Sequence, residues 1–146
     1  MAIQRAARRA GMDMSAYILE RVLPEPAKRF DALVSTLAAA EQPAFALAAM
    51  NDFLSQCTAG ELAAAVAEAP QMALPPLPGN YVAAMVEYAA ARQGMAPPAW
   101  TGAIAPLAQP WFGSELESLR LYLLTHAPAP FRRRNIFIDA TLGDRV

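Results

Sequence analysis

The sequence predicts an all-α protein, a small irregular helical bundle with proline-rich connectors and a mostly extended C-terminal tail. Three observations support this fold class. Apolar residues recur at spacings of three and four along most of the 146 residues. Helix-capping residues stand before several of these runs. Most of the 13 prolines lie between the runs, where they prevent a helix from continuing.

The first predicted unit, residues 1–24, is a helical hairpin. A short helix over residues 3–10 is stopped by Gly11, which can adopt the left-handed conformation that ends helices. Asp13 is placed to cap a second helix over residues 14–23. Its apolar residues recur at helical spacing, so one face should be buried.

The second predicted unit, residues 27–69, is a helical segment. Its three expected helices span residues 27–41, 43–57 and 59–69. Pro43 fits the first turn of the middle helix, where a missing N–H costs nothing. Thr58 and Glu61 stand three apart before an apolar run, which is the spacing of a capping box.

A proline-rich linker is predicted over residues 70–79, because its sequence offers few backbone donors for a helix or a central strand. The main organisational boundary is placed there. Residues 80–146 then form a helical C-terminal region with an arginine-rich tail. Asn80 is expected to cap a helix over residues 81–93, and a short turn follows over residues 99–104.

The last strong helix of the sequence ends near His126. Ser114 and Glu117 repeat the capping-box spacing before its leucine-rich run. Beyond it, residues 135–139 alternate in facing and fit either a short strand or a last helical turn.

Composition favours a cytoplasmic protein with apolar surface kept for a partner. Hydrophobic residues make up 55% of the chain and charged residues 17%. Cys57 is the single cysteine, so no internal disulfide or multi-cysteine metal site can form. No secretory signal or membrane span is expected. The net charge of −1 leaves nucleic-acid affinity to local arginine clusters, so DNA binding should be weak and salt-sensitive.

Residues suited to catalysis are scarce, and we expect no enzyme, cofactor or metal. His126 is the only histidine, and its position at a helix end suits helix capping or charge compensation. The chain contains no Gly-rich phosphate loop, HExxH or CxxC motif. Cys57 lies beside apolar residues and fits a small buried side chain.

The segment AIQRAARRAGMDMSAYILERVL resembles the helical part of ribbon-helix-helix regulators and of the antitoxins built on them. The matching residues are Ala7, Gly11, Asp13, Ser15, Tyr17, Ile18 and Leu23. In that family a β-strand precedes the first helix and reads DNA, and here only Met1 and Ala2 precede it. Base-specific DNA binding is therefore not expected. The resemblance leaves Arg5, Arg8 and Arg9 as nucleic-acid contacts, and an ordinary helical hairpin is the alternative.

The chain from Ala99 onward resembles the ending of small bacterial proteins associated with nucleotidyltransferase-type toxins as partner or antitoxin. The motifs are PWF, LRLYLL and PAPFRRRNIFIDA. The resemblance implies a partner-binding set made up of Trp111, Phe112, Phe131, Arg132, Arg133, Arg134, Asn135 and Phe137.

Three consecutive arginines, Arg132 to Arg134, cannot all point the same way on a regular element. At least one must pair with a carboxylate of this chain or point to a partner. Glu115, Glu117 and Asp139 are the expected internal carboxylates. In the alternative, Phe131 anchors the tail and the guanidinium groups engage an acidic or phosphate-bearing site on the partner.

These observations together favour an antitoxin-like protein that neutralises a cognate toxin enzyme, of nucleotidyltransferase type, by direct protein–protein contact. It would act as a monomer or a homodimer. Two alternatives remain open at this point: a DNA-binding regulator of ribbon-helix-helix type, and a small enzyme subunit.

Overall fold

The computed structural model describes residues 25–113 and 119–139, and within them the protein is mostly helical. Its elements are α3 (Glu25–Ala39), α4 (Pro43–Gln56), α5 (Ala59–Ala65), α6 (Pro76–Arg92), α7 (Ala99–Ala103), β1 (Trp111–Phe112), α8 (Arg120–His126), α9 (Ala129–Arg132) and β2 (Ile136–Phe137). The predicted all-α class is confirmed. The hairpin predicted for residues 1–24 and the Ser114–Glu117 cap lie outside the described residues.

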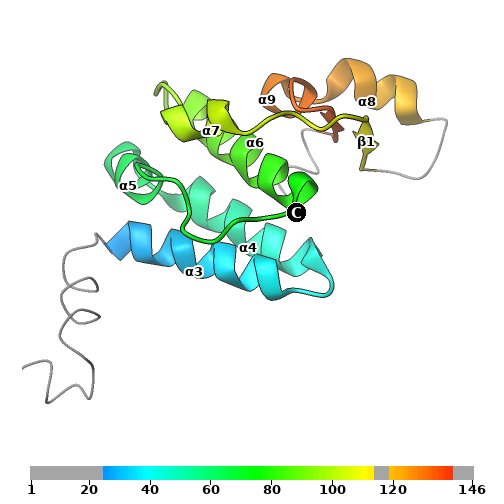
Figure 1. Ribbon diagram of the computed structural model, residues 1–146. Helices are drawn as coiled ribbons and strands as arrows, with labels where there is room; N and C mark the ends of the chain where they lie inside the picture. The colour runs from blue at the N-terminus through cyan, green and yellow to red at the C-terminus, as the bar shows by residue number, and fades with distance from the viewer. Residues whose placement is uncertain (1–24, 114–118, 140–146) are drawn as a thin grey trace, which may run out of the picture.

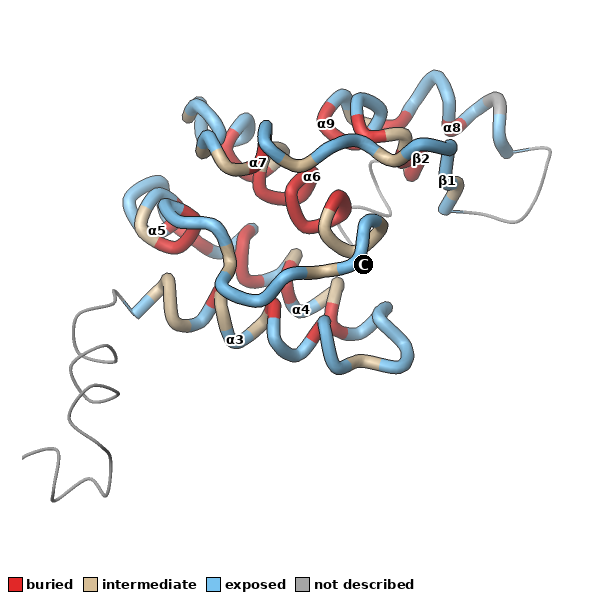
Figure 2. The backbone as a smooth tube through the Cα atoms, viewed as in Figure 1, coloured by how far each residue is buried: buried red, intermediate tan, exposed pale blue. Residues whose placement is uncertain are grey.

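Helix α6 is the centre of the fold. It packs against α4 on one side and against α7 and α9 on the other, while α3 packs on both α4 and α5 (Figure 1). Nine of its residues are buried, and Figure 2 shows buried positions along much of its length. An apolar helix with this many buried positions needs neighbours on several sides, which these two groups of helices provide.

A single main core joins the two halves of the chain. It includes Phe30, Met50 and Leu62 from the first three helices together with Val86 of α6 and Ile136 of β2. The proline-rich connector is thus no boundary between separate cores. Residues before and after it bury the same apolar cluster.

The proline-rich connector is shorter than predicted, because α6 already begins at Pro76. Prolines are tolerated in a first helical turn, where the backbone N–H groups have no partner within the helix. Asn80 therefore lies inside α6 and does not cap it. Its side-chain nitrogen donates to the carbonyl oxygens of Pro76 and Ala105, each at 2.9 Å.

The predicted capping box at the start of α5 is confirmed. The Glu61 backbone N–H donates to the Thr58 hydroxyl at 3.2 Å, and the Thr58 N–H donates to the Glu61 carboxylate at 3.1 Å. The bond from the Thr58 backbone is the main reason that the pKa of Glu61 is lowered. Pro43 also stands in the first turn of α4, as its position predicted.

The C-terminal tail is less extended than predicted. After Pro128 the chain forms α9, turns through Arg133 and Arg134, and passes Asn135 at a φ of 62°. It then pairs as β2 with β1 in parallel, with Trp111 opposite Ile136 and Phe112 opposite Phe137. The strand alternative is thus the one adopted, over two residues. Packing of the apolar side chains of the tail on α6 favours this compact path.

Within residues 25–113 and 119–139, no helix has the length and apolar character needed to span a membrane.

Candidate functional site

The predicted partner-binding residues divide into a buried group and an exposed group. Phe131 and Phe137 are buried, and Arg134 is only 5% exposed. Arg132 and Arg133, two positions and one position earlier, are exposed. The tight turn after α9 produces this division, because it directs successive side chains to different sides.

Phe131 holds α9 on the central helix α6. Its ring meets Tyr81 edge-on at 5.5 Å between centroids and Tyr88 at 6.2 Å. This edge-to-face geometry is favourable beyond the apolar area that it buries. Burial also raises the pKa of Tyr81 to about 12. Phe131 is thus an internal anchor, as predicted, but it has no surface to offer a partner in this conformation.

Arg134 is the hub of a buried polar network. Its Nε donates to the Glu87 carboxylate at 2.6 Å, and one terminal nitrogen donates to Asn80 Oδ1 at 2.9 Å and to the Ile104 carbonyl at 3.2 Å. The other terminal nitrogen donates to the Thr101 carbonyl at 2.5 Å. Since the planar guanidinium is used on three sides, Arg134 is a structural residue.

The internal partner of the arginine cluster differs from the predicted carboxylates. The Glu87 carboxylate pairs with Arg134, and Glu115 and Glu117 lie outside the described residues. Assigning Arg134 to a partner-facing site was therefore wrong in this conformation. Sequence analysis also missed Glu87 itself, although it is the only acidic residue of the 17-residue helix α6. A lone carboxylate in a largely apolar helix signals a buried pair.

Asn135 also forms hydrogen bonds within the protein. Its side-chain nitrogen donates to the Leu107 carbonyl at 2.7 Å, and its backbone oxygen accepts from the Trp111 N–H at 2.8 Å. The positive φ of Asn135 is a conformation that asparagine adopts more readily than most residues. These bonds hold residues 107–111 against the tail.

A group of large apolar side chains remains exposed beside the tail, and we call it the α8 apolar surface. Its members are Trp111 (37% exposed), Leu119 (40%), Tyr122 (44%) and Leu124 (42%). Leu123 and Ala127 are buried instead. They pack against Phe112 and Phe137 in a small second cluster. Tyr122 and Leu124 flank this buried stripe, one on each side of α8, and the ring of Trp111 packs against Tyr81 of α6 at 6.1 Å between centroids.

Arg120, Arg132 and Arg133 are exposed in the same C-terminal region. Arg120 lies over the Phe112 ring at 5.3 Å, and Phe112 stacks on Phe137 at 5.2 Å. Arg133 donates its Nε to the Ala129 carbonyl at 3.3 Å. In the described part of the chain, no ion pair joins Arg132 or Arg133 to a carboxylate. Both can therefore reach an external anion.

The chemically reactive side chains do not converge on one site. The His126 ring stacks on Tyr122 at 3.9 Å, and its Nδ1 lies 2.8 Å from the Thr125 hydroxyl. A hydrogen bond to Asp139 raises the pKa of Tyr122. Burial raises the pKa of the Cys57 thiol, which disfavours the reactive thiolate. Within residues 25–113 and 119–139, no group of His, Cys, Asp and Glu could hold a metal ion.

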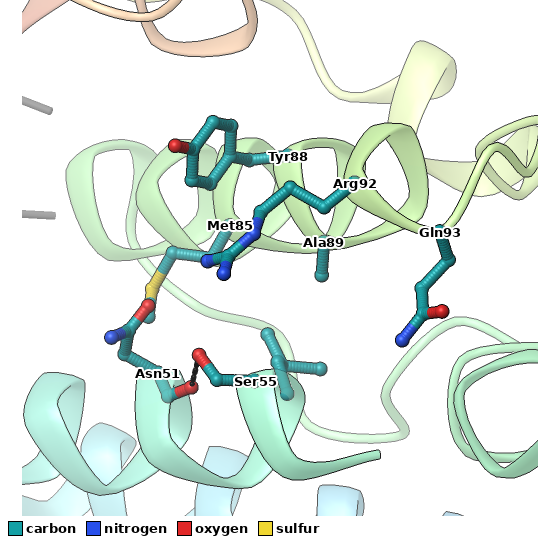
Figure 3. Close-up of a pocket in the computed structure, with 8 residues that line it drawn as sticks. Asn51, Ser55, Met85, Tyr88, Ala89, Arg92 and Gln93 are labelled. Carbon is teal, nitrogen blue, oxygen red and sulfur yellow. Dashed lines mark hydrogen bonds between the residues drawn. The ribbon is translucent and has the colours of Figure 1, made fainter. Parts of the chain in front are cut away.

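A small cavity between α4 and α6 offers little for ligand recognition. Its volume is about 150 Å³, and Figure 3 shows Arg92 of α6 and Gln93, which follows this helix, above Asn51 and Ser55 of α4. The Ser55 hydroxyl donates to the Asn51 carbonyl at 2.7 Å, so it is not an activated nucleophile.

The predicted nucleic-acid contacts Arg5, Arg8 and Arg9 lie outside the described residues. Comparison of the whole chain with protein-family models, with curated proteins and with solved structures gave no match.

Proposed function

We propose that this protein acts by binding another protein through the α8 apolar surface and the exposed guanidinium groups of Arg132 and Arg133. The observation behind this proposal is the exposure of Trp, Tyr and Leu side chains in this C-terminal region, together with two exposed arginines that form no ion pair with any described residue. Aromatic residues and arginine are enriched in protein interfaces and often supply most of the binding energy.

The narrower proposal is an antitoxin-like role, in which the bound partner is a toxin enzyme of nucleotidyltransferase type. It rests on the resemblance of the chain from Ala99 onward, carried by PWF, LRLYLL and PAPFRRRNIFIDA. Of the three arginines in that motif, Arg132 and Arg133 are exposed, and Arg134 is committed to Glu87. The partner-facing role is therefore assigned to the first two alone.

Co-expression of the chain with the untagged product of the adjacent gene tests this function. We expect the two proteins to purify together. Replacing Arg132 and Arg133 by alanine, or Tyr122 and Leu124 by alanine, should raise the Kd by at least about tenfold. Arg29→Ala is the control, because Arg29 is also an exposed arginine and lies on α3, outside the proposed binding residues.

Toxin neutralisation has a separate readout, which is growth of a host that produces the partner. The wild-type chain should restore growth, and the two double variants should restore less. A complex that forms with equal affinity in all variants would exclude the α8 apolar surface as the binding site.

A further inference from the structure

A second surface forms an apolar groove beside the first turns of α6. Its volume is about 690 Å³. We call it the proline groove. Its lining comes from residues 69–70 and 72–75 of the connector, from Pro76, Gly79, Asn80 and Val82 of α6, from Trp100 and Ala103 of α7, and from residues 104–108.

No charged side chain lines the proline groove. Asn80 and Trp100 are the only lining residues with polar side-chain atoms, and both are already used. The Asn80 amide donates to Pro76 and Ala105 and accepts from Arg134, while Trp100 Nε1 donates to the Val66 carbonyl at 2.7 Å. A charged ligand would lose its hydration here without gaining a side-chain partner, so the groove fits an uncharged one.

The outer wall of the groove, residues 104–108, is fixed from both sides. Asn80 holds the Ala105 carbonyl, Arg134 holds the Ile104 carbonyl, and Asn135 holds the Leu107 carbonyl. The Leu107 N–H also donates to the Arg134 carbonyl at 3.2 Å. Prolines restrict the φ angles of the facing connector. A groove with walls held in this way is preformed, which lowers the entropic cost of binding.

The size and composition of the groove favour a small ligand over a protein partner. Its volume of about 690 Å³ lies within the range of about 300–1,000 Å³ that is typical of small-molecule sites. Its lining is mainly alanine, proline and leucine and has one aromatic residue, Trp100, and no arginine. Protein interfaces are instead enriched in aromatic residues and arginine.

We propose that the proline groove binds an uncharged, predominantly apolar small molecule. This inference does not depend on the proposed partner-binding function, since it concerns different residues.

Nile red, an uncharged apolar dye, serves as the probe. We expect saturable binding of one dye per chain, with energy transfer from Trp100 in a Trp111→Phe background. Ala103→Phe places a ring in the groove and should weaken binding by at least about tenfold. Ala38→Phe is the matched control, because Ala38 is exposed on α3 and lies outside the groove lining, and it should change the affinity by less than about twofold.

Ala73→Phe fills the groove from the connector side and keeps the test valid if Ala103→Phe does not fold. Circular dichroism establishes which variants keep their helical structure. Dye binding that is non-saturable, that is equal in groove-filled and control variants, or that needs two chains per dye would overturn the proposal.

Discussion

The α3–α5 layer and the segment from Ala99 to Asp139 are stabilised in different ways. The layer buries apolar side chains that recur at helical spacing, among them Phe30, Val34 and Leu62, and its capping box joins residues three apart. The described part of the C-terminal segment contains three short helices, α7, α8 and α9, and two strands of two residues each. Its position depends on side chains that hydrogen-bond across 28 to 54 residues.

This difference shows how a segment with little regular secondary structure can be ordered. Arg134 joins α6, α7 and the residue after α7, and Asn135 joins the tail to Leu107. Each buried donor then has an acceptor, and among the described residues no buried side-chain nitrogen or oxygen lacks a hydrogen bond. Hydrogen bonds between buried polar groups therefore hold this segment in place, whereas periodic apolar packing holds the α3–α5 layer together.

The largest effect is expected from Arg134→Ala. The variant leaves the Glu87 carboxylate, 16% exposed, without its cation, and removes the donor to the Ile104 carbonyl and to Asn80 Oδ1. Unfolding in urea should show a loss of about 3–5 kcal/mol. Arg133→Ala is the control and should stay within about 0.5 kcal/mol of wild type. If both variants lose equal stability, the assigned difference between the two arginines is wrong.

The matching test in the α3–α5 layer is Leu62→Ala. Leu62 is fully buried in α5, so the variant loses apolar burial and leaves a cavity. The free energy of unfolding should fall by about 2–5 kcal/mol. Hydrogen exchange should separate the two variants: Leu62→Ala should expose amides of α3 to α5 more than those of residues 104–112, and Arg134→Ala should do the reverse. Identical exchange patterns would argue against two modes of stabilisation.

Local pattern was enough to predict much of the layer from the sequence. Helical periodicity, Pro43 in a first turn and the Thr58–Glu61 capping box all involve residues that are close in the chain. Such signals depend on local backbone geometry, so they can be recognised in the sequence without the tertiary structure.

The start of α6 and the interior of the tail could not be predicted in the same way. Proline is compatible with either a connector or a first helical turn. The packing of Leu77 and Val82 on the core stabilises the helical alternative. Arg134 and Glu87 lie 47 residues apart, so no sequence spacing indicates their pairing. The observation that three adjacent arginines cannot share one direction was correct. Which one turns inward depends on the turn after α9.

The candidate site was therefore only partly accessible from sequence. The tail motif assigned Phe131, Arg134 and Phe137 to partner binding, although all three are buried. Their burial follows from the compact path of the tail. The exposed leucines and Tyr122 of α8 were predicted as part of an amphipathic helix, and their exposure beside a buried stripe emerges only from the packing of α8 on β2.

The next effect concerns the ionisation of Tyr81, a residue of α6 whose ring packs against the rings of Trp111 and Phe131. Its folded-state pKa of about 12 exceeds the value of about 10 expected when unfolded. The unfolded state therefore loses its proton first, and stability falls as the pH rises from about 10 to about 12, by about 1.4 kcal/mol per unit. Tyr81→Phe should remove this part of the decline. Urea unfolding at about pH 9 and about pH 11 measures it, and an identical decline in the variant would contradict the assignment.

The smallest effects separate the two roles of Asn135, which are a hydrogen bond and a left-handed backbone conformation. Asn135→Gly keeps the positive φ at no steric cost but loses the 2.7 Å bond to the Leu107 carbonyl, so it should cost about 1 kcal/mol. Asn135→Ala loses the same bond and adds the strain of a Cβ in this conformation, so it should cost about 1 kcal/mol more. Urea unfolding of both variants gives the two quantities separately. Equal losses would mean that the backbone relaxes around residue 135, and a larger loss for glycine would contradict the conformational role.

Nile red titration of the Asn135→Gly variant links this hydrogen bond to the proline groove. Releasing the Leu107 carbonyl frees part of the outer wall of the groove, so the variant should bind the dye more weakly. The amides of the α3–α5 layer should keep their protection from hydrogen exchange.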